Sequence, residues 1–212
     1  LTGITVSFNS APLEWWLSLP IIVVYPLLFG WVSYQTATKL AEHKRRLQVM
    51  STRDGMTGVY NRRHWETMLR NEFDNCRRHN RDATLLIIDI DHFKSINDTW
   101  GHDVGDEAIV ALTRQLQITL RGSDVIGRFG GDEFAVIMSG TPAESAITAM
   151  LRVREGLNTL RLPNTPQVTL RISVGVAPLN PQMSHYREWL KSADLALYKA
   201  KKAGRNRTEV AA

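Results

Sequence analysis

The sequence has 212 residues, of which 43% are hydrophobic, so it can form one well-filled globular core with some length left for an attached segment. A formal net charge of +5 suits an anionic partner but does not distinguish a nucleotide, a nucleic acid and a lipid surface. Cys76 is the only cysteine, which excludes a disulfide framework and a thiolate zinc site and fits a reducing cytoplasm. Because the chain starts at Leu1 without a signal-peptide pattern, we expect it to be the later part of a longer protein.

Residues 15–34 predict a transmembrane helix, because they carry no charge and are long enough to cross a hydrocarbon layer of about 30 Å. Aromatic residues at both ends of the run match the belts found at headgroup depth. Lys39 and the basic residues at 44–46 follow, which by the positive-inside rule predicts that the chain continues in the cytoplasm. A buried, kinked core helix is the alternative, because Pro20 and Pro26 weaken the helix.

Residues 36–53 contain no glycine or proline and are rich in good helix formers, which predicts a cytoplasmic linker helix. Leu40 and Leu47 lie one heptad apart, so pairing of two chains through this linker is a hypothesis. We therefore divide the chain into the end of a membrane region at 1–35, the linker, and a globular domain at 54–212.

The globular part begins with a predicted amphipathic helix over residues 64–78. A continuous apolar run that ends in acids follows at 84–91 and predicts a central strand buried on both faces. Apolar residues at helical spacing predict a second helix over 106–120.

Two apolar segments, 125–129 and 134–138, are joined by Gly130-Gly131-Asp132-Glu133, which predicts an antiparallel hairpin whose glycines supply positive φ angles. Three elements follow: a helix over 141–160 that starts with a capping-box pattern, a strand over 168–177, and a helix over 186–203 ended by Gly204. Interleaved helices and strands with an antiparallel hairpin predict an α+β fold, with a mixed or antiparallel sheet and helices on its faces.

Acidic residues occur at two places where predicted strands end. Asp89 and Asp91 are two apart, so both carboxylates should point the same way. A divalent cation or basic residues could neutralise them, or they could simply be exposed to solvent at the sheet edge. If the hairpin turn lies beside this strand end, Asp132 and Glu133 join Asp89 in one acidic cluster. Magnesium prefers such oxygen ligands, and paired glycines let a phosphate approach the backbone closely.

Polar residues after the first strand could recognise a nucleotide, since asparagine and aspartate can read a purine edge and lysine suits a phosphate. These residues are Lys94, Asn97, His102 and Asp106. Lys201 and Arg205, four apart near the end of the last helix, could hold phosphates. Taken singly, each residue of the first set would more often be solvated surface, and the last pair could instead complement the macrodipole of the last helix.

Residues 128–134, Arg-Phe-Gly-Gly-Asp-Glu-Phe, resemble the signature of the GGDEF family of diguanylate cyclases. The similarity extends over residues 54–63, 89–97 and 201–206, with Met56 and Val59 in the first of these where leucine is usual. The whole chain also resembles membrane-bound cyclases that have a MASE-type N-terminal sensor.

The resemblance implies a palm-like fold with a mixed sheet flanked by helices, preceded by a transmembrane helix and a helical linker. It also implies a bacterial inner-membrane protein with a cytoplasmic catalytic domain. The implied activity joins two GTP molecules into cyclic di-GMP and releases two pyrophosphates, in a homodimer whose domains each hold one GTP.

The same resemblance implies the role of each site residue. Asp132 is the candidate base for the attacking 3′-hydroxyl, and Lys94 stabilises charge on the phosphoryl group. The residues implied to hold two Mg²⁺ or Mn²⁺ ions are Asp89, Ile90 through its carbonyl, Asp132 and Glu133. Those implied to bind substrate are Phe93, Lys94, Asn97, His102, Asp106, Lys201 and Arg205.

The segment Arg121-Gly122-Ser123-Asp124 lies shortly before Gly130 and resembles the family's inhibitory product site, where arginine binds the guanine or phosphate of cyclic di-GMP. Arg121 and Asp124 are therefore the candidate allosteric residues. A surface loop that closes a helix is the alternative interpretation.

Three other functions compete with the cyclase. The first is a binding module that senses GTP or cyclic di-GMP without turnover, which the intact Gly130 to Phe134 motif disfavours. The second is a cyclase that acts on ATP or makes a mixed dinucleotide, which Asn97 and Asp106 disfavour without excluding it. The third is nucleic-acid binding, and we expect no nucleic-acid partner because no basic strand interleaved with aromatic residues occurs.

Overall fold

The structure is a computed structural model that describes residues 24–40, 52–162, 165 and 167–211. It divides into two compact units, Leu1–Ser51 and Thr52–Ala212. In the first unit residues 24–40 are helical, whereas the start of the predicted membrane span and residues 41–51 lie outside the described residues. None of the helices in the described segments is both long and apolar enough to cross a membrane, so the span stays a prediction.

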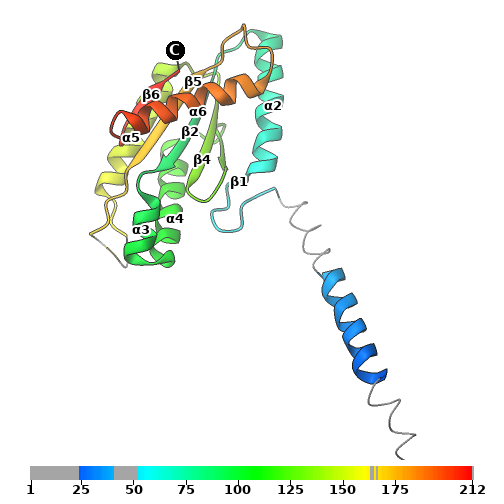
Figure 1. Ribbon diagram of the computed structural model, residues 1–212. Coiled ribbons are helices and arrows are strands. Elements are labelled where there is room, and N and C mark those ends of the chain that lie inside the picture. The colour runs from blue at the N-terminus through cyan, green and yellow to red at the C-terminus, as the bar shows by residue number, and fades with distance from the viewer. Residues whose placement is uncertain (1–23, 41–51, 163–164, 166, 212) are drawn as a thin grey trace, which may run out of the picture. The chain divides into compact units, whose positions relative to one another are not determined.

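The second unit is built on a six-stranded mixed sheet in the order β1-β3-β4-β2-β5-β6 (Figure 1). The strands are β1 (Tyr60–Asn61), β2 (Ala83–Ile90), β3 (Val125–Arg128), β4 (Glu133–Ser139), β5 (Ile172–Pro178) and β6 (Thr208–Val210). The four inner strands pair antiparallel, and the two short edge strands run parallel to their neighbours. The predicted α+β fold with a mixed sheet flanked by helices is therefore confirmed.

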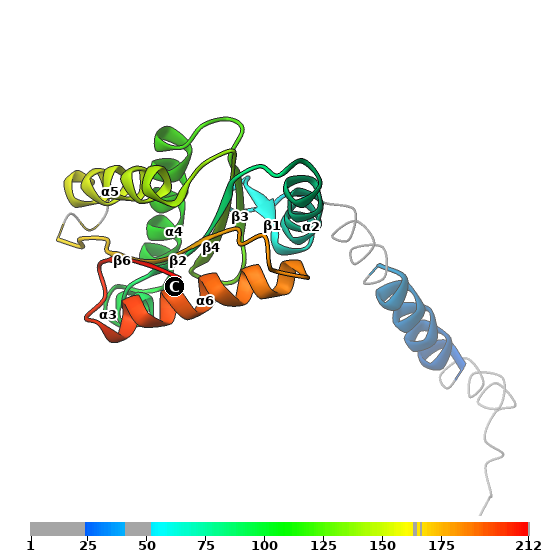
Figure 2. The same ribbon diagram turned by 90° about the horizontal axis from the view of Figure 1, so that it is seen from above.

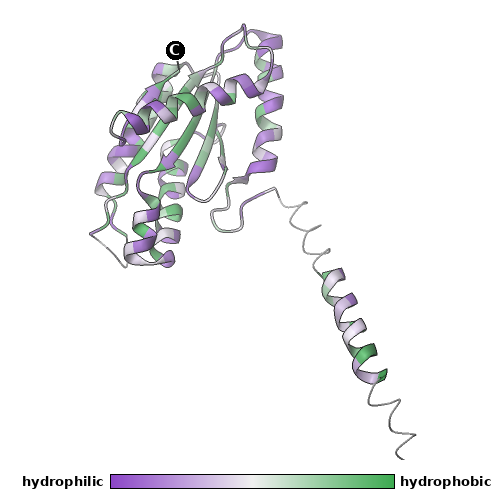
Figure 3. Ribbon diagram, in the orientation of Figure 1, coloured by the Kyte–Doolittle hydropathy of each residue, from purple (hydrophilic) through white to green (hydrophobic). Residues whose placement is uncertain are grey.

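Helices cover both faces of this sheet. They are α2 (Arg62–His79), α3 (Phe93–Trp100), α4 (His102–Thr119), α5 (Ala143–Thr159) and α6 (Tyr186–Lys202). The view in Figure 2 shows α4 and α5 on one side of the sheet and α2 and α6 on the other. The strands are correspondingly the most hydrophobic elements of the unit (Figure 3).

Alternation along β2 divides the core into two layers. Leu86 and Ile88 belong to the cluster that packs against α4 and α5, whereas Leu85 and Ile87 belong to the cluster of α2 and α6. Every residue of β2 is buried, as its unbroken apolar run predicts for a strand with helices on both faces. The strand is thereby fixed in position up to its carboxyl end.

Two local predictions about backbone conformation were wrong. The hairpin glycines do not take positive φ angles, which among the described glycines occur at Gly58, Gly101, Gly140 and Gly204. The helix after the hairpin is capped by Pro142 rather than by a capping box, and the Thr141 hydroxyl instead donates to the Ser139 carbonyl at 3.1 Å. At the helix start a residue far along the chain also takes part, because the Thr84 hydroxyl donates to the Thr141 carbonyl at 2.7 Å.

The element boundaries differ from the prediction in three regions. The short helix α3 was not predicted, and α4 begins four residues before the predicted 106. The strand predicted to begin at 168 begins at Ile172. The short edge strands β1 and β6 were also missed, because two or three residues carry no periodicity.

We predict that Gly175→Ala destabilises the domain, because α6 crosses β5 at this glycine. A Cβ atom there would lie 2.2 Å from the carbonyl oxygen of Ala193 and 2.3 Å from the amide nitrogen of Leu197. Overpacking of this kind typically costs about 1 to 3 kcal/mol. Urea unfolding should show a loss in this range, whereas Gly55→Ala, where a Cβ atom meets nothing within 4 Å, should unfold like the parent protein.

Candidate active site

The centre of the site is the place where β2 ends beside the turn between β3 and β4. Asp89 pairs directly with Glu133 across the antiparallel β2–β4 ladder. Residues opposite one another in such a ladder point to the same face, with Cβ atoms about 5 Å apart. The Ile90 amide donates to the Asp132 carbonyl at 3.4 Å, which brings the turn to the strand end. The predicted convergence of the two acidic stretches is thus present in the structure.

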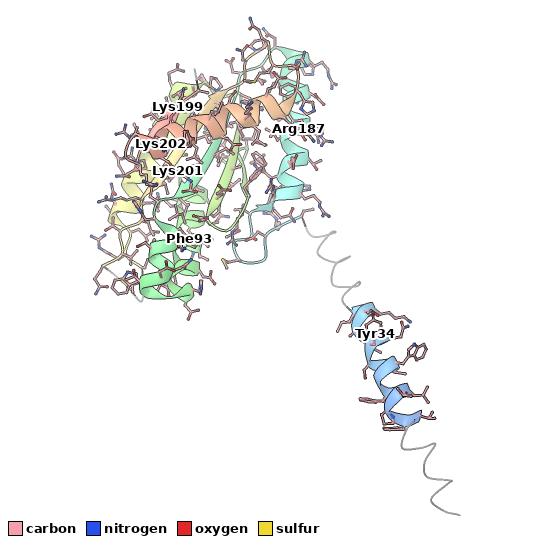
Figure 4. All side chains as sticks on the ribbon, in the orientation of Figure 1. Tyr34, Phe93, Arg187, Lys199, Lys201 and Lys202 are labelled. Carbon is pink, nitrogen blue, oxygen red and sulfur yellow. The ribbon has the colours of Figure 1, made fainter. Side chains whose placement is uncertain are left out.

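Asp89 is buried among like charges at this point, with 8% of its surface exposed. Burial raises the pKa of Asp89, and the negative charges of Asp132 and Glu133 raise it further. The ammonium group of Lys201, on the last turn of α6, opposes the rise and lies 2.7 Å from the Asp89 carboxylate (Figure 4). The acidic cluster therefore already has one positively charged side chain, Lys201, as a partner.

A further acid lies near this cluster and was not predicted. Although Asp194 on α6 is an exposed residue, partial desolvation raises the pKa of its carboxyl, the charge of Glu133 adds to the rise, and Arg62 opposes it. Arg62 in turn stacks on the Phe129 ring at 4.5 Å from its centroid. Nothing in the local sequence marks Asp194, because only the packing of α6 on the sheet brings it toward the hairpin turn.

Arg128 fixes the conformation of the hairpin turn. Its guanidinium donates to the Gly131 carbonyl at 3.1 and 2.7 Å and to the Asp54 carboxylate at 3.2 Å. Thr57 donates to the same carboxylate through its amide and its hydroxyl, at 3.0 and 2.6 Å. Although burial acts to raise it, the pKa of Asp54 is lowered by these hydrogen bonds. Asp54 and Thr57, at the start of the domain, thus help to hold the turn in place through Arg128.

The surface above the turn is open to a bulky group. A Cβ atom at Gly131 would meet nothing within 4 Å, and one at Gly130 would meet only the Glu133 carboxylate, at 3.4 Å. The two glycines therefore leave the backbone accessible from outside, as a triphosphate would require.

These residues fit a divalent cation that is shared with a phosphate ligand. Among the described residues no group of three or more histidine, cysteine or acidic side chains is arranged to hold an ion. Magnesium, however, usually binds through one or two carboxylates together with substrate phosphates and water. Asp89 and Asp132, with the Ile90 carbonyl at the same strand end, offer the hard oxygen donors that such binding needs.

The predicted purine-reading residues lie on α3 and α4. The Asn97 Oδ1 atom is buried without a hydrogen-bond partner in the described part of the chain, and it faces Gly105 of α4. A Cβ atom at Gly105 would lie 1.9 Å from that oxygen, so only glycine leaves the asparagine in place. Phe93 lines the same crossing, because its ring would lie 3.2 Å from that Cβ atom (Figure 4).

The other predicted substrate residues are exposed. Asp106 lines a cavity of about 480 Å³ between α4 and residues 160–162, and Asn97 does not line this cavity. The side chains of Lys94 and His102 make no hydrogen bond or ion pair within the described segments. Arg205 follows α6 with an exposed side chain. The structure thus brings Lys201 into contact with Asp89, whereas these four residues make no hydrogen bond or ion pair to the acidic centre in the described part of the chain.

Asp91 has its own set of partners. It is 5% exposed and accepts hydrogen bonds from the Ser173 hydroxyl at 2.6 Å and from the Asn206 amide at 2.8 Å. The two acids at the end of β2 therefore do different things, since Asp89 faces Lys201 and Asp91 contacts the segment after α6.

The predicted product site forms a separate cavity of about 230 Å³. Arg121 and Asp124 line it, and the Arg121 amide donates to the Asp124 carboxylate at 3.0 Å. Burial raises the pKa of Asp124, whose Oδ1 atom is buried and has no partner in the described residues. Arg152 of α5 lines the same cavity. Sequence reasoning missed Arg152, because only the packing of α5 beside the end of α4 brings it there.

Comparison with known proteins gives a consistent family assignment. A family model described as "Diguanylate cyclase, GGDEF domain" matches residues 51–207. The whole chain is 99% identical to the probable diguanylate cyclase DgcC of Escherichia coli (strain K12), of which it spans 57% of the length.

Solved structures agree with this assignment. The GGDEF domain of DgcB from Caulobacter crescentus in complex with c-di-GMP is 30% identical with a TM-score of 0.71, over 76% of this chain and 93% of that one. The diguanylate cyclase SiaD in complex with its activator SiaC from Pseudomonas aeruginosa is 33% identical with a TM-score of 0.72, over 93% of this chain and 78% of that one.

We predict that Asp89→Asn stabilises the folded domain at neutral pH. Because the pKa of Asp89 is raised on folding, its ionised form destabilises the fold, and this effect is lost as the pH falls and the carboxyl becomes protonated in both states. Urea unfolding should therefore show a higher free energy of unfolding for the variant at pH 7. This difference should shrink as the pH falls toward 3.8, the ordinary pKa of aspartate. The exposed Asp82→Asn, at the other end of β2, should show no such gain; a loss at position 89 would mean that the pair with Lys201 outweighs the burial.

Proposed function

The chain belongs to the GGDEF family of diguanylate cyclases, and from this we propose that it condenses two GTP molecules into cyclic di-GMP and releases two pyrophosphates. The observation that carries the proposal is the β2–β4 pairing, which holds Asp89 opposite Glu133 and brings Asp132 to the end of β2. The name of the 99% identical relative, a probable diguanylate cyclase, supports the same activity.

The acidic centre is proposed to hold two divalent ions, Mg²⁺ or Mn²⁺, through Asp89, the Ile90 carbonyl and Asp132, with Glu133 close by. Bound ions would neutralise the triphosphate and polarise the reacting phosphoryl group. Asp132 is the proposed base for the attacking 3′-hydroxyl. The Lys94 ammonium, which has no partner in the described residues, is free to stabilise charge on the phosphoryl group.

Base recognition is proposed at the crossing of α3 and α4. The unpaired Asn97 Oδ1 atom can accept from a guanine N–H, which would satisfy a buried acceptor that otherwise has no partner. Asp106 is the second proposed reader, and Phe93 and His102 would line the ribose or base. Lys201 and Arg205 would hold the phosphates.

Because each domain holds one GTP, the reaction needs two copies, so we propose a homodimer. We also propose that the protein is anchored in the bacterial inner membrane with its catalytic domain in the cytoplasm. The uncharged run at 15–34, followed by basic residues, supports this placement.

Inhibition by the product is proposed at the cavity formed by Arg121, Asp124 and Arg152. Two guanidinium groups suit the phosphates or the guanine acceptor edge of cyclic di-GMP. The unpaired Asp124 Oδ1 atom can accept from a guanine N–H.

The cyclase proposal is tested by incubating the 212-residue chain with Mg²⁺ and either GTP or ATP and identifying products by mass. GTP alone should yield cyclic di-GMP. Asp132→Ala should reduce synthesis by about 10² to 10⁴, the usual contribution of a general base. The exposed Asp82→Ala serves as the matched control and should retain the parent rate.

Two other results would replace the proposal. Tight GTP binding with no product from the parent protein would favour the sensor module. Turnover of ATP at a comparable rate would show that Asn97 and Asp106 do not select guanine.

We predict that Arg121→Ala and Arg152→Ala each relieve product inhibition. Loss of one charged hydrogen-bond donor should weaken binding by about 1.5 to 3 kcal/mol, which is about tenfold or more in the inhibitory concentration. Titrating cyclic di-GMP into the synthesis assay measures this effect, and Arg114→Ala, an exposed arginine on α4 outside this cavity, should leave inhibition unchanged. Unchanged inhibition in both cavity variants would contradict the product site.

A further inference from the structure

We propose that Asp91 and Arg154 are positioning residues that hold the turn at residues 204–206 and thereby aim Arg205 at the triphosphate of GTP. The inference rests on the proposed function, since it assumes that Arg205 contacts phosphate. Neither Asp91 nor Arg154 is among the residues proposed above to bind metal, guanine or phosphate.

The turn after α6 has a strained backbone. Gly204, Arg205 and Asn206 have φ angles of 107°, 61° and 45°, so three consecutive residues lie in the left-handed region. A residue with a side chain loses about 1 to 2 kcal/mol in this conformation. Such conformations persist only when the surrounding structure holds them, and they cluster at functional sites. The backbone contributes one contact, from the Arg205 amide to the Ala200 carbonyl at 3.0 Å.

Asp91 holds the turn from the sheet. Its carboxylate accepts from the Asn206 amide at 2.8 Å on one side and from the buried Ser173 hydroxyl at 2.6 Å on the other. A carboxylate that accepts from a backbone N–H makes a stronger bond than a neutral acceptor. Because Asp91 comes two residues after Asp89, the strand that places the acidic centre also places the turn.

Arg154 holds the same turn from α5. Its Nη2 atom donates to the Asn206 carbonyl, and it lies 3.4 Å from the Asn206 side-chain oxygen. The Nε atom of Arg154 is buried without a partner in the described residues, which is unfavourable for stability. An apolar side chain at this position would not bury an unpaired N–H group. The contact with the turn is therefore the observed interaction that an apolar residue could not replace.

Together the two side chains bind the two peptide groups that flank Asn206, Asp91 from just after β2 and Arg154 from α5. Arg205 precedes Asn206, and Lys201 lies one turn earlier on α6 against Asp89. Loss of either support should therefore misdirect the phosphate-binding end of the site. Base recognition should be spared, because Asn97 lies on α3 and faces α4.

The test compares ligands that differ in their phosphates. Equilibrium binding of the α,β-methylene analogue of GTP, which cannot release pyrophosphate, is measured beside that of GMP on the 212-residue chain with Mg²⁺. Asp91→Asn should weaken analogue binding by about tenfold, the order expected for one charge-assisted bond, and GMP binding by less than about threefold. Asp82→Asn, the same change at the exposed residue immediately before β2, should alter neither. Equal losses for both ligands would overturn the inference.

A double-mutant cycle shows whether Asp91 acts through Arg205. In an Arg205→Ala background, Asp91→Asn should cause little further loss of analogue affinity. A full additional loss would overturn the positioning role. If Asp91→Asn does not fold, Arg154→Met decides the question by the same ratio of analogue to GMP binding. Absence of product from the parent protein would refute the cyclase proposal alone, because these binding ratios do not depend on turnover.

Discussion

The antiparallel pairing of β2 with β4 is the constraint on which the rest of this domain depends. It sets Asp89 opposite Glu133, and the bond from the Ile90 amide to the Asp132 carbonyl closes the turn against the strand end. A shift of one residue in the register would send these acids to the opposite face, away from α6 and Lys201. The position of the acidic centre is therefore set by the register of the buried strand β2.

This arrangement places like charges together in a partly buried site, which a protein selected for stability alone would avoid. Burial and the neighbouring acids raise the pKa of Asp89, and Lys201 compensates only in part. Perturbed carboxyl groups of this kind are typical of functional sites. The Lys201 ammonium pairs with Asp89 in the cluster, and a phosphate-bearing ligand with its metal would offer this ammonium a second partner.

Two turns near the acidic centre are held in a similar way. In each, a charged side chain binds the backbone of the turn. Near the N-terminus, Asp54 orients Arg128, which binds the Gly131 carbonyl. Near the C-terminus, Asp91 and Arg154 bind the peptide groups of Asn206. Side chains far along the chain thus contribute to both turns, since Asp54 orients Arg128 at the first, and Asp91 and Arg154 bind the second.

The sequence by itself determined the core elements and the chemical type of the site. An unbroken apolar run identifies β2, helical periodicity identifies α2 and α6, and the Gly-Gly-Asp-Glu motif identifies the acidic turn, because each signal lies within a few consecutive residues. Tertiary structure alone decided the approach of the hairpin turn to the end of β2 and the partners of Asp91. It also decided the placement of Arg152 and Arg154 on α5. These features depend on contacts between segments far apart in the chain, which no local pattern encodes.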